Sequence, residues 1–133
     1  MDAEMQQWLI SAETDFSVAR HLFDTYYPKP IEIICYHCQQ SAEKAIKAVI
    51  LSLKTNDGIP KKHDLSFLLQ QIKNRVSIPE LLFDYADTLT PYGVSVRYPN
   101  ELNLTERHAA SALQQGEQIL LWAKGIVSKQ AEI

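Results

Sequence analysis

IEIICYHCQQSAEKAIKAVILSLK, residues 31–54, is the stretch that decides the fold. Its apolar residues recur every three or four positions, which is the period of one face of an α-helix. They are Ile31, Ile34, Cys35, Cys38, Ala42, Ala45, Ile46, Val49 and Leu53. Because a helix with an apolar face must bury that face against another element, this stretch predicts a helix in the core of the domain.

The same helical period extends to other parts of the chain. Residues 2–24 carry apolar side chains three or four positions apart, and Pro28 and Pro30 then interrupt the pattern. Asp64 is a suitable N-cap for a third helix that we expect to run to about Arg75. The chain upstream of residue 76 therefore predicts three helices.

Two further helix starts carry a local signature. Ser77-Ile78-Pro79-Glu80 and Asn103-Leu104-Thr105-Glu106 both have the pattern of a capping box. The helix that follows the second box is expected to end near Lys129. Since strand signals are nearly absent, we expect one all-α domain over residues 1–133, an up-and-down bundle of about five helices, three of them long.

Composition points to an ordinary globular protein. The chain has 133 residues, 46% of them hydrophobic and 22% charged, with a net charge of −3. The first residues lack the basic start and apolar run of a signal peptide, and no stretch reaches the roughly 20 apolar residues of a membrane helix. We therefore expect a cytoplasmic protein that has no membrane partner.

The two cysteines form a C-x-x-C, Cys35-Tyr36-His37-Cys38. Such a pair can be a redox dithiol or half of a zinc site. A redox pair usually follows a strand and begins a helix, whereas these cysteines lie on the apolar face within a predicted helix. His37 lies off that face. We expect both cysteines to pack in the core, and we expect neither a metal nor a cofactor.

A polar flank accompanies the apolar face of residues 31–54. It consists of Tyr36, Gln39, Gln40, Glu43, Lys44 and Lys47, spaced to share one side of the helix. Glu43 and Lys47 are an i,i+4 pair in the favourable order. The flank is either a solvated face, or a polar groove between helices, or a dimer surface.

Basic and aromatic residues gather in two other segments. Lys61-Lys62-His63-Asp64 is a basic group at a helix start, either solvated or suited to an anion. Arg97 stands near Tyr92 and Tyr98 between two prolines, where it could grip a phosphate while a ring stacks on a base. The alternative is a loop that seals one end of the bundle. Asp15 could pair with Arg97 or Lys47.

Four segments occur in order along nearly the whole chain: WLISAETDFSVARHLF, CYHCQQSAEKAIKAVI, KKHDLSFLL and VRYP. Together they resemble the HEPN-domain family. The resemblance implies a five-helix bundle, usually a homodimer, often encoded beside or fused to a minimal nucleotidyltransferase. It also implies nucleotide binding and, in many branches, metal-independent RNA cleavage. In those ribonucleases an arginine is followed, after four to six residues, by a histidine that acts as general acid and base.

This chain departs from the ribonuclease pattern. The three positions allowed after Arg97 hold Leu102, Asn103 and Leu104, and the next histidine is His108. The resemblance therefore implies a ligand-facing Arg97 without a catalytic histidine. We expect a nucleotide- or RNA-binding module that partners a nucleotidyltransferase in a toxin–antitoxin-like pair. The expected ligand-binding residues are Arg97, Tyr98, Tyr92, His63, Lys44 and Lys47. The alternatives are a ribonuclease that pairs Arg97 with His63 or His108, and a purely structural adaptor.

Overall fold

The computed structural model describes residues 2–54, 58–94 and 103–131. Within these ranges the chain is all-helical, with five α-helices, one short 3-10 helix and no strand. The elements are α1 (Ala3–Thr25), α2 (Ile31–Ser52), α3 (Leu65–Gln70), α4 (Leu81–Leu89), η1 (Thr90–Gly93) and α5 (Glu106–Ala131). The prediction of an all-α fold with three long helices is confirmed.

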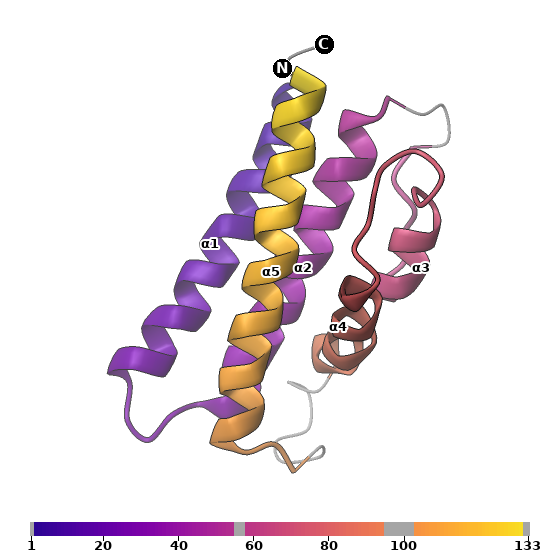
Figure 1. Ribbon diagram of the computed structural model, residues 1–133. Coiled ribbons are helices and arrows are strands. Elements are labelled where there is room, and N and C mark those ends of the chain that lie inside the picture. Colours follow the sequence, from indigo (N-terminus) through magenta and orange to yellow (C-terminus); the bar gives the residue numbers. More distant parts are fainter. Residues whose placement is uncertain (1, 55–57, 95–102, 132–133) are drawn as a thin grey trace.

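The three long helices lie side by side, and the shorter ones cover one side of them (Figure 1). α1 runs down the bundle, α2 runs back up, α3 and α4 return the chain to the lower end, and α5 runs up again. Helix α2 packs against every other helical element of the described chain. This central position explains why residues 31–54 determine the fold, because each neighbour covers a different part of the α2 surface.

Side chains fix where two of the helices begin. Asp2 accepts a hydrogen bond from the Glu4 backbone N–H at 2.9 Å at the start of α1. Asp64 accepts from the Phe67 backbone N–H at 3.1 Å, which confirms its predicted role as N-cap of α3. Each bond satisfies a backbone donor that the first turn of a helix leaves without an intrahelical partner.

The predicted bounds of α3 are too long. The helix ends at Gln70, and the chain continues to Val76 through turns such as Arg75 N–H to Ile72 O at 2.9 Å. These tight turns still bury Ile72 in the core. The Arg75 guanidinium donates to the Leu53 carbonyl at 3.2 Å and so ties the chain after α3 to the end of α2.

Neither predicted capping box sets a helix start. Helix α4 begins at Leu81, and the Ser77 carbonyl accepts a hydrogen bond from the Trp122 indole N–H at 3.0 Å. Helix α5 begins at Glu106, and Asn103 has a φ of +51°, outside the extended region of an N-cap residue. The four-residue pattern therefore does not mark the first turn of the helix at either site.

Both cysteines are buried in the core, as predicted. Burial, with a contribution from Glu32, raises the pKa of the Cys35 thiol to about 12. Burial also raises the pKa of the Cys38 thiol, which packs near Gly116 of α5. Protonated thiols in such surroundings are poor nucleophiles. Their place in the core accounts for the C-x-x-C without redox or metal chemistry.

The described residues contain no group of three or more histidine, cysteine, aspartate or glutamate side chains placed to hold a metal ion. None of the described helices is long and apolar enough to cross a membrane.

Candidate functional site

The polar flank of α2 is largely enclosed by the protein. Gln39, Glu43 and Lys47 are all buried, and they follow one another at intervals of four residues along the helix. A solvated face is therefore the wrong interpretation for these three residues. Because buried polar and charged groups are costly without partners, their hydrogen bonds determine how this part of the molecule is built.

Glu43 is the centre of these hydrogen bonds. Its Oε1 accepts from the Gln39 amide at 3.0 Å, and its Oε2 accepts from the Lys47 ammonium at 3.0 Å. His63 Nδ1 lies 3.1 Å from both carboxylate oxygens. Burial alone would raise the pKa of the Glu43 carboxyl, but the hydrogen bonds from Gln39, Lys47 and His63 outweigh burial and lower it. Glu43 is therefore ionised at neutral pH.

A second carboxylate lies on the neighbouring helix. Asp15 of α1 is 2.9 Å from His37 Nδ1 through one oxygen and accepts from the Lys44 ammonium at 2.7 Å through the other. The suggested pairing of Asp15 with Lys47 is wrong. Lys47 instead pairs with Glu43, and its ammonium lies 5.6 Å from the centre of the Trp8 ring.

These residues form two matching groups, each made of one carboxylate, one lysine and one histidine. We call them, together with the linking amides, the polar cluster: Asp15, His37, Gln39, Gln40, Glu43, Lys44, Lys47 and His63. The Gln40 amide donates to the Gln39 Oε1 at 2.8 Å and so extends the hydrogen-bond chain from Glu43 toward the His37–Lys44 side of α2. The carboxylates balance the two lysines, so the histidines decide the net charge of the polar cluster.

The start of α3 positions His63. It directly precedes Asp64, the N-cap of α3. The Leu65 backbone N–H donates to the Thr90 hydroxyl at 3.1 Å, which ties the start of α3 to the end of α4. A carboxylate oxygen can only accept, so His63 Nδ1 carries the proton. The ring is 76% exposed, and its other nitrogen, Nε2, lies on the side away from Glu43.

The short helix η1 closes on the polar cluster from another side. A Cβ atom added to Gly93 would lie 2.8 Å from the Gln39 side-chain carbon Cδ, so the backbone of η1 rests directly on this amide. Tyr92 is buried, and burial raises the pKa of its phenol. A ligand could stack on the Tyr92 ring only if its neighbours moved. Arg97 and Tyr98 lie outside the described residues.

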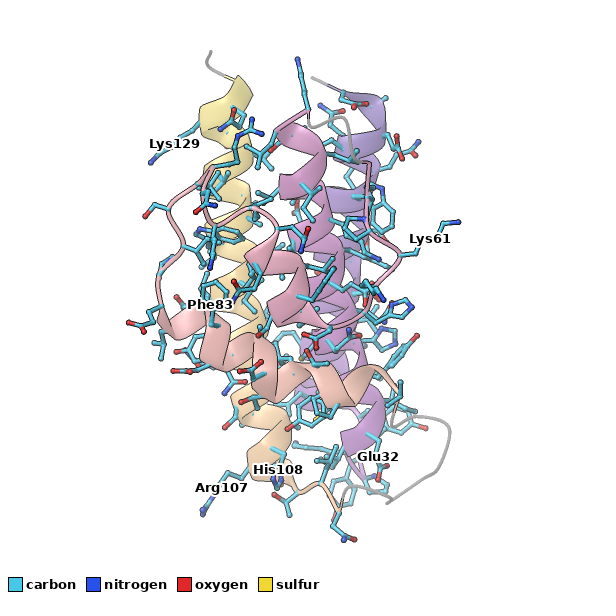
Figure 2. The ribbon with its side chains drawn as sticks, turned by 90° about the vertical axis from the view of Figure 1, so that its right-hand side faces the viewer. Glu32, Lys61, Phe83, Arg107, His108 and Lys129 are labelled. Atoms are coloured by element: carbon cyan, nitrogen blue, oxygen red, sulfur yellow. The ribbon has the colours of Figure 1, made fainter. Side chains whose placement is uncertain are left out.

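His108 lies elsewhere in the molecule. Its Nδ1 accepts from the Thr105 backbone N–H at 3.0 Å at the start of α5. Figure 2 draws His108 and Arg107 at the lower end of the bundle, level with Glu32 in the first turn of α2. Glu43 is three turns further along α2, about 16 Å at the rise of an α-helix. The structure therefore brings Lys47 and His63 together on Glu43, places Lys44 on Asp15, and leaves His108 apart.

Family comparison agrees with this architecture. The profile of the HEPN domain matches residues 5–126. The chain belongs to the HEPN domain family. No curated protein sequence matches it.

Solved structures share the HEPN fold over almost their whole length. TT1696 from Thermus thermophilus is 23% identical, with a TM-score of 0.82 over 94% of this chain and 99% of that one. ST0689, an archaeal HEPN homologue, is 27% identical, with a TM-score of 0.72 over 92% and 97%. The HEPN domain protein TM0613 from Thermotoga maritima is 24% identical, with a TM-score of 0.73 over 92% and 98%.

The polar cluster of this HEPN domain can offer several donors to an anion. Lys44 is 26% exposed and makes one ion pair, so its ammonium has further N–H groups to donate. His37 and His63 both point Nδ1 at a carboxylate. Sequence reasoning missed His37, whose aspartate partner stands 22 positions away. The sequence feature that could have identified His37 is its spacing from Gln40, Lys44 and Lys47, which places all four residues on one stripe of α2.

Proposed function

We propose that this HEPN domain binds a nucleotide or RNA through the polar cluster, together with Arg97 and Tyr98. In this proposal Lys44, His63 and Arg97 contact phosphate, and Tyr98 stacks on a base. Lys47 serves mainly to hold Glu43, since its side chain is only 7% exposed. Tyr92 supports the site from within the core.

One observation supports the proposal. Lys44 carries a positive charge and His63 can take up a proton, and each is held by a carboxylate: Lys44 by Asp15, and His63 by the buried Glu43. Holding long or rotatable side chains in place before a ligand arrives reduces the entropy lost on binding. A surface lysine with no such support loses that advantage. The geometry therefore favours an anion-binding site over a merely solvated flank.

Calorimetric titration with AMP and with a short single-stranded RNA tests this binding role. We expect Lys44→Ala and Arg97→Ala to weaken binding by tenfold or more, on the order of 1.4 kcal/mol. Lys129→Ala is the matched control, because Lys129 is exposed near the far end of α5 (Figure 2). If Lys44→Ala and Arg97→Ala bind as the wild type does while folding normally, this binding site is wrong.

We further propose that the chain is a single cytoplasmic domain, forms a homodimer and partners a minimal nucleotidyltransferase in a toxin–antitoxin-like pair. Family membership supports this role. Light scattering on the purified chain measures the dimer. Co-expression with a nucleotidyltransferase encoded by a neighbouring gene, followed by size-exclusion chromatography, tests the pair. A monomer that never co-elutes with such an enzyme contradicts both assignments.

The same samples separate the rival functions. Metal-free RNA cleavage that is lost in Arg97→Ala would establish a ribonuclease instead of a binding module. A chain that neither binds nucleotides nor cleaves RNA, yet forms a stable complex with its partner, would be a structural adaptor.

A further inference from the structure

The polar cluster has an adjustable charge. Each carboxylate contacts one lysine and one histidine: Asp15 contacts Lys44 and His37, and Glu43 contacts Lys47 and His63. With neutral histidines the charges of these six side chains cancel. Each histidine that takes up a proton adds one positive charge, and imidazole is the side chain that ordinarily changes charge between about pH 5 and 8.

In each histidine the hydrogen-bond pattern leaves Nε2 as the nitrogen that can accept that proton. Because Nδ1 already donates to a carboxylate, the added proton goes to Nε2, which then becomes a second donor. A protonated ring would form an ion pair with the carboxylate that its Nδ1 contacts. For His63 this carboxylate is the buried Glu43. For His37 it is Asp15, whose side chain is 13% exposed.

Within the described residues, the charged groups around the two rings belong to α1, α2 and the segment before α3. Helix α1 supplies Asp15, and α2 supplies Glu43, Lys44 and Lys47 together with the Tyr36 ring, which meets His37 edge to face. The segment before α3 supplies Lys62 and Asp64, the chain neighbours of His63. The four residues of η1 include no charged side chain, and α5 packs on the cysteine side of α2 at Gly116.

The two groups border a common surface of α2. His37, Gln40 and Lys44 lie on one stripe, and the Gln40 amide reaches across to Gln39, which holds Glu43. Gln40 therefore lies between His37 and Glu43 on the surface of α2. An internal phosphodiester brings one negative charge to this surface, whereas a terminal phosphate brings about two near neutral pH.

We propose that the polar cluster selects a terminal phosphate, a phosphate monoester, over a phosphodiester, and that His37 and His63 take up protons as this phosphate binds. This inference deepens the proposed function. Its claim that nucleotides bind rests on that function, whereas its claim that the polar cluster binds a phosphate monoester does not. It favours mononucleotides and phosphorylated RNA ends over the interior of an RNA strand.

AMP and 3′,5′-cyclic AMP are matched probes, because they differ in whether the phosphate is a monoester or a diester. Calorimetry at pH 7.0 and 8.0, in buffers of different ionisation enthalpy, counts the protons taken up. We expect tighter binding of AMP than of cyclic AMP, with net proton uptake. Affinity for AMP should increase from pH 8.0 to 7.0 by up to about tenfold per proton.

Two variants assign the protons to residues. His63→Gln and His37→Gln should each reduce proton uptake and the preference for AMP. His21→Gln, an exposed histidine of α1 outside the polar cluster, should change neither. Nuclear magnetic resonance of the histidine Cε1–H signals needs no variant: in the wild type, His37 and His63 should shift toward the protonated form when AMP is added.

Inorganic phosphate separates this inference from the proposed function. Phosphate binding with proton uptake, without any added affinity for nucleotides or RNA, would support the phosphate site and overturn the nucleotide function. Equal affinity for AMP and cyclic AMP without proton uptake would overturn this inference and leave the nucleotide function standing. If neither nucleotides nor millimolar phosphate bind, both are wrong.

Discussion

His63 and Glu43 stand twenty positions apart in the sequence, yet His63 Nδ1 lies 3.1 Å from both oxygens of the Glu43 carboxylate. The contact joins an exposed ring to a buried anion. It forms because the start of α3 is docked against the middle of α2. Through Glu43, this one contact connects the surface to Lys47 in the interior.

Glu43→Gln should destabilise the fold strongly. The variant leaves the Lys47 ammonium buried beside a neutral amide, and removing one partner of a buried ion pair costs about 3 kcal/mol or more. Urea unfolding at pH 7 measures the loss. Glu13→Gln is the control, since Glu13 pairs with Lys124 at the surface with both side chains 45% exposed. The control should change stability by about 0.5 kcal/mol or less.

A companion variant checks the cause. Glu43→Gln combined with Lys47→Met removes the unpaired charge, so the double variant should be more stable than Glu43→Gln alone. If the two have the same stability, the buried ammonium is not the source of the loss.

The stability of the fold should decrease in acid partly through Glu43. The pKa of this carboxyl is lower in the folded protein than its ordinary value of 4.5. A lowered folded-state pKa contributes stability above the unfolded-state pKa, and the contribution is lost as the pH falls through the folded-state value. Unfolding free energies measured from pH 7 to pH 3 should therefore decrease less steeply in Glu43→Gln than in the wild type. Parallel curves would contradict this assignment.

Gly93→Ala and Gly125→Ala should have opposite effects. A Cβ at Gly93 would come within 2.8 Å of the Gln39 side chain, which is itself hydrogen-bonded to Glu43, so the amide would have to shift. Overpacking of this kind costs about 1–3 kcal/mol. A Cβ at Gly125 of α5 would meet nothing within 4 Å, and alanine there should stabilise the helix by roughly 0.5–1 kcal/mol. Thermal unfolding of both variants measures the contrast.

The cysteines should be unreactive until the protein unfolds. Both thiols are fully buried, and the raised pKa of Cys35, about 12, leaves little thiolate at pH 8. A colorimetric thiol reagent should therefore label neither cysteine in the native state and both in urea. Replacing both with alanine should cost some stability through lost packing and leave nucleotide binding unchanged. Loss of binding in a folded double variant would show that core packing is not their whole role.

Local sequence was a good guide to helices and a poor guide to their ends. The period of residues 31–54 predicted α2 and placed Cys35 and Cys38 inside, because helical phase depends only on the residues of the helix itself. Neither capping box marked a helix start: the Ser77 carbonyl accepts from the Trp122 indole N–H, and Asn103 has a left-handed backbone conformation. The contact with Trp122 joins residues 45 positions apart, which a four-residue pattern does not contain.

By itself, the sequence determined the all-α class, the three long helices, the buried cysteines and the family, since each depends on periodicity or on motifs in order. Only the tertiary structure decided that Glu43 and Lys47 are buried, that Asp15 meets His37 and Lys44, and that His63 joins them. A helix period tells which residues share a face, but the partner of that face depends on how separate helices dock. The charge balance of the polar cluster is therefore a property of the packed bundle.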